Sequence, residues 1–202
     1  DGLQQWGFLS WEEMRVMEQS GVIDIQSHTM THTKYFVSDK VIDFHRPAAD
    51  SLYYIGNKNI DRKPYYISDP AFDQLLPYGY PVFEMQSAVI ARKIDINKEF
   101  VEYCTEVLRD YDFSKYNFDD AFAKVKGKYD ELKTSNKLIT SIETEEEFEK
   151  RIRYEIFESK RIIEENLNKK VGFLCWPHGD NKERAHDLAM EAGYLATTLG
   201  SK

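Results

Sequence analysis

The stretch that decides the fold is VGFLCWPHG, residues 171–179. Residues 171–175 are apolar, with one glycine among them, and such a short run predicts a buried strand. Pro177 and Gly179 follow at once, and both residue types favour a tight turn. The sequence therefore predicts a strand that ends directly in a turn.

Helices are predicted on both sides of this strand. Upstream, Thr144 and Glu147 form a capping box, and apolar residues recur at helical spacing as far as Leu167. Downstream, a helix is predicted over 181–193, with an asparagine as N-cap and a glycine at its end. Residues 194–199 then return to a strand pattern.

The same order occurs near the other end of the chain. Ser10 and Glu13 form a capping box, Gly21 can end the helix, and residues 22–25 predict a short strand. Repeated helix-to-strand units predict an α/β fold in which helices cover a parallel sheet. In such folds the reactive groups gather in loops beyond the carboxyl ends of the strands.

The middle of the chain has a different character. From residue 35 to residue 141 it is rich in aromatic residues and proline, with helices predicted over 98–109 and 118–132. So many aromatic residues are untypical of a disordered segment. We therefore predict one domain in three parts, namely a first segment 1–34, an insertion 35–141 and a last segment 142–202.

Composition narrows the function classes. The 202 residues carry a formal charge of -8 and are 42% hydrophobic and 31% charged, and lysines are interleaved with acids. No basic stripe favours nucleic acid as a partner, and no apolar run approaches the ~20 residues of a membrane helix. The two cysteines, Cys104 and Cys175, lack the spacing of a thiolate metal site and are predicted to be buried thiols.

The candidate chemistry lies in SHTMTHT, residues 27–33, directly after the predicted strand 22–25. His28 and His32 are four residues apart, so a helical turn would bring both imidazoles to one divalent ion. The alternative is a pair of surface histidines held by local hydroxyl groups. A catalytic metal site has three protein ligands, so a carboxylate is the expected third.

These residues resemble two motifs of one enzyme family. A helix opened by SWEE (10–13), a strand and then SHTMTHT are similar to the second motif of the NodB-homology polysaccharide deacetylases. The segment FLCWPHG (173–179), followed by a helix and AGY (192–194), is similar to the third motif. The chain looks closest to the poly-N-acetylglucosamine deacetylase branch, partly because Cys175 stands where many other members carry arginine.

The resemblance implies a fold and a reaction. The fold is a deformed (β/α) barrel, of which this chain would supply a part, with a long mixed insertion. His28, His32 and an aspartate would hold one divalent ion, with zinc the expected metal, while a second aspartate acts as base. The substrate would be an N-acetylated polysaccharide or cell-surface glycan, cleaved at a carbon-nitrogen bond that is not a peptide bond, outside the cell or in its envelope.

The resemblance also assigns roles to the loop after the strand. Trp176, Pro177 and Gly179 would line the substrate groove, and the backbone N–H of His178 would help to hold the oxyanion of the reaction. Many relatives carry tyrosine where His178 stands, but a backbone donor does not depend on the side chain. The other reading of Pro177 and Gly179 is an ordinary strand-to-helix turn.

Two family motifs have no counterpart here. The Asp-Asp pair should precede the helix that begins after Ser10, and the late histidine would lie beyond Lys202. Asp119 and Asp120 have the right letters but follow the histidines in a charged helical stretch, so we expect solvated or helix-capping carboxylates. We expect a domain that is incomplete at both ends and that turns over poorly in isolation.

Two other functions remain open. The first is a noncatalytic glycan-binding domain that lacks the acidic motif, and the second is a metal-dependent hydrolase of another substrate class. Outside the two motifs, His45 and the tyrosine pairs 53–54 and 65–66 are expected to pack the insertion's own small core. His186 is expected to be a solvated surface residue.

Overall fold

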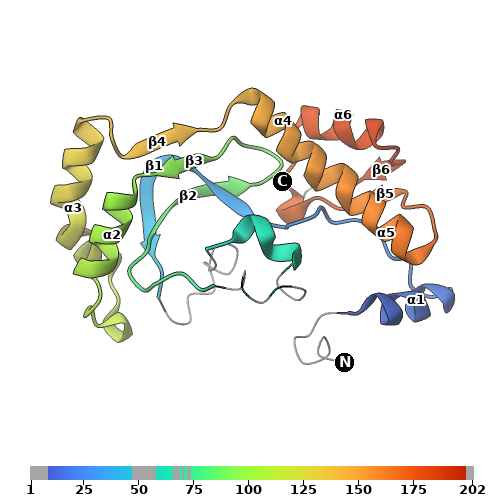
Figure 1. Ribbon diagram of the computed structural model, residues 1–202, viewed down its shortest axis with the longest axis horizontal. Coiled ribbons are helices and arrows are strands. Elements are labelled where there is room, and N and C mark those ends of the chain that lie inside the picture. The colour runs from blue at the N-terminus through green and yellow to red at the C-terminus, as the bar shows by residue number, and fades with distance from the viewer. Residues whose placement is uncertain (1–8, 47–57, 66–68, 70, 72–73, 199–202) are drawn as a thin grey trace. The chain divides into compact units, whose positions relative to one another are not determined.

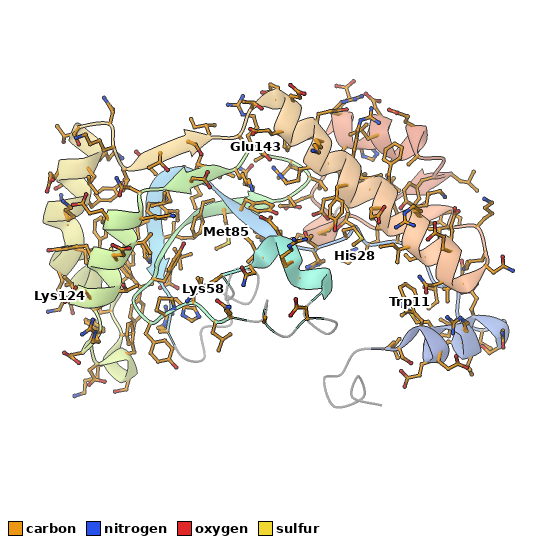
Figure 2. The ribbon with its side chains drawn as sticks, viewed as in Figure 1. Trp11, His28, Lys58, Met85, Lys124 and Glu143 are labelled. Atoms are coloured by element: carbon orange, nitrogen blue, oxygen red, sulfur yellow. The ribbon has the colours of Figure 1, made fainter. Side chains whose placement is uncertain are left out.

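The computed structural model describes residues 9–46, 58–65, 69, 71 and 74–198 (Figure 1). The chain divides into two compact units. Unit 1 comprises the described residues up to His32 and those from Glu149 onward, and unit 2 comprises the described residues from Thr33 to Phe148. The predicted division at 34/35 and 141/142 stays a prediction.

Unit 1 carries the helix-strand alternation. Its elements, with α4 beginning in unit 2, are α1 (Trp11–Gln19), α4 (Glu145–Arg153), a π-helical turn (Tyr154–Glu158), α5 (Ser159–Leu167), β5 (Phe173–Leu174), a 3-10 turn (Pro177–Gly179), α6 (Glu183–Glu191) and β6 (Ala196–Thr197). Strands β5 and β6 pair in parallel and α6 connects them, which is a short βαβ unit (Figure 1). The mixed α/β class is confirmed, although no closed barrel forms among the described strands, which pair two by two.

Both predicted capping boxes are confirmed. The Ser10 backbone N–H donates to Glu13 Oε2 at 2.7 Å, and Glu13 N donates back to Ser10 Oγ at 3.2 Å. Thr144 and Glu147 exchange the same two bonds at 2.8 and 3.2 Å. Each box satisfies donors that the first helical turn leaves unpaired, so both helices begin where the sequence predicts.

The predicted strand over 22–25 is wrong. This segment runs without a ladder partner, and only Ser27 forms an isolated parallel bridge, to Leu174. Side chains take the backbone groups instead, because Ile25 N donates to Glu18 Oε2 at 2.7 Å and Lys169 Nζ donates to Ile25 O at 3.0 Å. Val22 is 82% exposed, so its apolar side chain is not part of a core.

Strand β5 is shorter than the predicted 171–175 for the same reason. Val171 N donates to Glu164 Oε1 at 2.9 Å, and the Gln26 side-chain oxygen accepts from the next two backbone N–H groups. Strand β6 likewise covers only the middle of the predicted 194–199, whose last residue lies outside the described chain. Side-chain acceptors therefore replace part of the ladder.

The helix predicted from residue 144 to Leu167 is interrupted. Five residues, Tyr154–Glu158, form a π-helical turn between α4 and α5. Such turns insert one extra residue into a helix and are frequent at functional sites. The helix over 181–193 is confirmed except for its cap, because Lys182 and not Asn181 stands at the N-cap position of α6.

Unit 1 has an apolar core around these elements. The fully buried side chains come from the end of α4 and the π turn, from β5 and the loop after it, and from the inner face of α6. They include Ile152, Ile156, Leu174, Trp176 and Leu188. This core fixes the ends of the segments that carry the candidate site.

Unit 2 contains two antiparallel strand pairs and two helices. Its elements are β1 (Lys34–Phe44), a 3-10 helix (Ile60–Tyr65), β2 (Pro81–Ser87), β3 (Ile94–Ile96), α2 (Lys98–Val107), a 3-10 turn (Phe113–Lys115), α3 (Phe118–Thr134) and β4 (Ile139–Ile142). Strand β1 pairs with β2 and β3 with β4. Helices α2 and α3 confirm the two predicted helices of the insertion.

Aromatic packing holds unit 2 together, while the packing predicted for the tyrosine pairs stays a prediction. Its core includes Phe44, Phe83 and Phe100, with ring contacts between β1, β2, α2 and α3. Of the tyrosine pairs, residues 53, 54 and 66 lie outside the described chain. Asp119 and Asp120 are exposed in the first turn of α3, as expected. Among the described helices, none is long and apolar enough to span a membrane.

Candidate metal centre

The histidine loop, residues 27–32, brings the two predicted ligands together. The ring centroids of His28 and His32 lie 4.7 Å apart. The loop does not make the helical turn that the four-residue spacing suggested, because Thr29 and His32 adopt left-handed backbone angles, with φ of 66° and 50°. Two left-handed residues that are not glycine are uncommon in so short a loop, and such strain is typical of functional sites.

A backbone carbonyl fixes the orientation of His28. The His28 Nδ1 atom lies 2.8 Å from the carbonyl oxygen of Cys175. A carbonyl can only accept, so Nδ1 carries the proton and donates it, and Nε2 of a neutral ring keeps its lone pair. Histidine ligands of metal ions usually make such a hydrogen bond through the other ring nitrogen. His28 is exposed to solvent, and an ion can reach it.

A third imidazole lies beside the pair. The His178 ring centroid is 4.7 Å from that of His32, so the three rings form a row with His32 in the middle. His178 is exposed and has a left-handed φ of 59° in the turn Pro177–Gly179. The sequence pointed to this backbone but not to the side chain, although histidine in place of the common tyrosine was the available signal. The predicted role of its N–H toward an oxyanion stays a prediction.

The side chains at this site are of a kind that binds divalent transition metals, but they are too few to complete a site. Neutral imidazoles are good ligands for zinc, copper and nickel. Within the described residues, however, no group of three or more histidine, cysteine, aspartate or glutamate side chains is arranged to hold an ion. His28 and His32 can supply two ligands, and no carboxylate of the described residues is arranged with them as the expected third.

Other residues of the loop after β5 have structural surroundings that the sequence did not reveal. Trp176 is 1% exposed, Pro177 is buried and Gly179 is partly buried with a φ of 73°. The Trp176 indole N–H has no hydrogen-bond partner among the described residues. The predicted contact of these three residues with substrate stays a prediction.

Two predictions about neighbouring side chains are wrong. Cys175 is exposed rather than buried, because exposed and buried side chains alternate from Phe173 to Trp176 and Cys175 falls on the exposed side. His186 is not a solvated residue. It is partly buried, its Nε2 and Nδ1 atoms lie 3.1 Å from Asn181 Oδ1 and 3.0 Å from Thr197 Oγ1, and its ring packs edge-on against Trp176.

A buried glutamate lies beneath the histidine loop. Glu155, in the π turn, accepts hydrogen bonds from the backbone N–H groups of Met30 and Thr31 and from the Thr31 hydroxyl. Glu155 belongs to neither of the two motifs, and the sequence predicted no role for it. The signal was its position three residues after Ile152 and next to Ile156, on the apolar face of the helix, where a carboxylate needs a partner.

A second buried contact joins the start of the loop to the same helix. Ser27 Oγ and Ser159 Oγ lie 2.9 Å apart, and the Tyr194 hydroxyl donates to the carbonyl oxygen of Ile156 at 3.1 Å. Burial raises the pKa of Tyr194 above its ordinary value, so its hydroxyl keeps the proton that it donates. The tyrosine of the AGY segment thus supports the π turn.

Comparisons with known proteins leave the family open. No family model matches the chain, and no curated protein matches it. Among solved structures, it is similar to a de-N-acetylase from Aggregatibacter actinomycetemcomitans, with 18% sequence identity and a TM-score of 0.46. The match covers 94% of this chain and 40% of that one. A likeness at this level fixes neither family nor activity.

Proposed function

We propose that the chain carries part of the metal site of a hydrolase that removes acetyl groups from an N-acetylated polysaccharide or cell-surface glycan. His28 and His32 are its two histidine ligands. The observation that carries the proposal is the pairing of these rings, 4.7 Å apart, with His28 Nδ1 bound to the Cys175 carbonyl. That arrangement leaves Nε2 of His28 as the donor for an ion.

The acetyl-group assignment rests on the two motifs taken together. They are far apart in the sequence, yet both lie in unit 1 and make contact there. His28 hydrogen-bonds to Cys175, and the His32 ring lies beside that of His178. The motif resemblance implies one shared site, and these contacts support it. A cell-surface glycan as substrate would place the protein outside the cell or in its envelope.

The residues of the site have separate tasks in this proposal. A divalent ion, zinc in the first instance, would supply a Lewis acid for the acetyl carbonyl and would lower the pKa of a bound water to ~7. His28 and His32 hold that ion, and the carbonyl of Cys175 keeps His28 in the binding tautomer. The backbone N–H of His178 donates to the oxygen that becomes negative.

One observation favours a second candidate, a noncatalytic glycan-binding domain. The described residues do not bring a carboxylate to the two histidines in a metal-holding arrangement. Without a carboxylate base, a deacetylase-type site can bind an acetylated sugar but has no group to activate water. Both the deacetylase and the glycan-binding domain would therefore bind an acetylated glycan, but only the deacetylase would release acetate.

The test combines turnover with binding. The zinc-loaded protein is incubated with N-acetylglucosamine oligomers, released acetate is measured, and saturation-transfer NMR records oligomer binding. We expect slow, zinc-dependent acetate release that falls to background in a double variant, His28→Ala with His32→Ala. The matched control is His45→Ala, a histidine of unit 2.

The outcomes separate the candidates. Zinc-dependent binding of the oligomer without acetate release would favour the glycan-binding domain. Neither binding nor release, or release that the double variant leaves intact, would contradict the proposed function. An O-acetylated glycan and a set of unrelated amides run in parallel identify a hydrolase of another substrate class.

A further inference from the structure

The carboxylate beneath the histidine loop has a geometry that the proposed chemistry does not use. Glu155 is 1% exposed. Its Oε2 atom accepts from Met30 N at 3.0 Å and from Thr31 N at 2.9 Å, and its Oε1 atom accepts from Thr31 Oγ1 at 2.6 Å. Both oxygens are therefore engaged by the two residues midway between His28 and His32.

These bonds hold the middle of a loop that has no regular secondary structure. The histidine loop forms no regular helix or strand, and its only ladder contact is the bridge at Ser27. The left-handed angles of Thr29 and His32 each cost energy that other contacts must offset. A side chain with two acceptor oxygens can take all three donors of the loop at once, so Glu155 is suited to that task.

A second contact from the same stretch of helix holds Ser27, the first residue of the histidine loop. Ser159, the first residue of α5, shares its hydroxyl proton between the carbonyl oxygens of Glu155 and Ile156, at 2.9 and 3.1 Å. The same Ser159 hydroxyl lies 2.9 Å from Ser27 Oγ. One turn of helix thus holds the histidine loop both at its start and at its middle.

We infer that Glu155 is a positioning residue for the metal site: its carboxylate fixes the turn at Met30 and Thr31, and thereby sets the separation of the His28 and His32 rings. The inference rests on the proposed function, because it assumes that these two rings bind one ion. Glu155 does not itself coordinate the ion. Its effect reaches the ion only through the loop.

Three variants show whether Glu155 acts by positioning the histidine loop, by its charge or by stabilising the fold in general. Glu155→Ala removes all three acceptor contacts. Glu155→Gln keeps the shape, because its amide oxygen can accept from the two backbone N–H groups and its NH₂ can donate to the Thr31 hydroxyl. Glu165→Ala, in α5, is the matched control, because it deletes an exposed carboxylate whose partner is Arg161.

Two readouts are recorded for each variant. In the metal-free protein, NMR measures the nuclear Overhauser contact between the His28 and His32 rings and the hydrogen-exchange protection of the Met30 and Thr31 amides. Calorimetry then measures zinc affinity. We expect Glu155→Ala to lose the ring contact and the protection and to bind zinc about 10- to 100-fold more weakly, the usual effect of removing support from metal ligands.

The variants Glu155→Gln and Glu165→Ala show whether the loss of zinc affinity comes from the lost hydrogen bonds. Glu155→Gln should retain the ring contact and bind zinc within a few-fold of the parent protein, and Glu165→Ala should match the parent. A folded Glu155→Ala protein that keeps the ring contact and the zinc affinity would overturn the inference. So would a Glu155→Gln variant as impaired as Glu155→Ala, because that result would assign the effect to charge.

A milder variant covers the case in which Glu155→Ala does not fold. Thr31→Val removes only the hydroxyl donor to Oε1 and keeps the side-chain shape. We expect reduced protection of the Thr31 amide and weaker zinc binding, and an unchanged result in both would overturn the inference. If the parent protein itself takes up no zinc, the proposed function fails, while the metal-free NMR comparison still decides whether Glu155 positions the loop.

Discussion

Two cysteines in the chain differ sharply in their surroundings. Cys104 lies in the core of unit 2, and burial raises its pKa to about 12, so almost no reactive thiolate forms at neutral pH. The Cys175 side chain is exposed, and the carbonyl of the same residue orients His28. We expect a thiol reagent to label one cysteine in the folded protein, Cys175, and both after unfolding.

Mass spectrometry of the labelled peptides measures this difference. Cys175→Ser is the control that should leave the folded protein unlabelled. Labelling of Cys104 at a rate similar to that of Cys175 would contradict the burial that the structure assigns to it. The sequence placed Cys104 correctly because helical periodicity reports burial, whereas an all-apolar run such as 171–175 does not show which face of the segment is exposed.

The same limit applies to other single residues of the site. The spacing of His28 and His32 was visible in the sequence, because two histidines in a polar loop are unusual. The partners of that loop were not visible, since Glu155 and Cys175 meet it only through tertiary contacts across more than a hundred residues. His186 was misjudged for the same reason, as its contacts with Trp176 and Thr197 come from the next elements.

At the scale of elements, the capping box of α1 gives a direct stability prediction. Ser10→Ala removes the acceptor of the Glu13 N–H, and loss of such a cap costs ~1 kcal/mol of the free energy of unfolding. Ser10→Asp keeps an acceptor and should lose much less. Urea denaturation followed by circular dichroism measures both. Equal losses in the two variants would show that the hydroxyl has a different role.

A charge cluster joins the end of α1 to the loop after α5, and it predicts a pH dependence. Hydrogen bonding to Lys169 lowers the pKa of Glu18 and of Asp24 below their ordinary values of 4.5 and 3.8. A carboxylate with a lowered pKa stabilises the fold above its unfolded pKa, and this contribution is lost as the pH falls through the folded pKa. The stabilisation is therefore present at pH 7 and lost in acid.

Lys169→Met tests this charge cluster. The difference in the free energy of unfolding between parent and variant should be largest near neutral pH and should shrink below about pH 4. Lys126→Met is the control, because its exposed partner Asp130 lies on the same helix surface and such pairs contribute little. A difference that stays constant from pH 7 to pH 3 would contradict the assignment.

Helices were predicted more accurately than strands, for a physical reason. A helix satisfies its own backbone groups, so apolar spacing and caps are enough to locate α1, α2, α3 and α6. A strand needs a partner from elsewhere in the chain. In unit 1 the side chains of Glu18, Gln26 and Glu164 supply many of those bonds, and local sequence does not reveal which acceptor a backbone N–H will find.

At the scale of the whole molecule, the two units should respond differently to zinc. An ion that binds only the folded state stabilises it, by about 2.7 kcal/mol at 100 times the dissociation constant. The candidate ligands all lie in unit 1. We expect zinc to slow hydrogen exchange at residues 27–32 and 175–179, and to leave the core of unit 2 around Phe83 and Phe100 unchanged. Slowing confined to unit 2 would place the binding site there.

Calorimetric titration of the metal-free protein with zinc measures whether His28 and His32 together bind one divalent ion. We expect one site per chain, lost in the double variant His28→Ala with His32→Ala and retained in His45→Ala. Zinc binding that survives in the double variant, or no binding in the folded parent protein, would contradict this expectation.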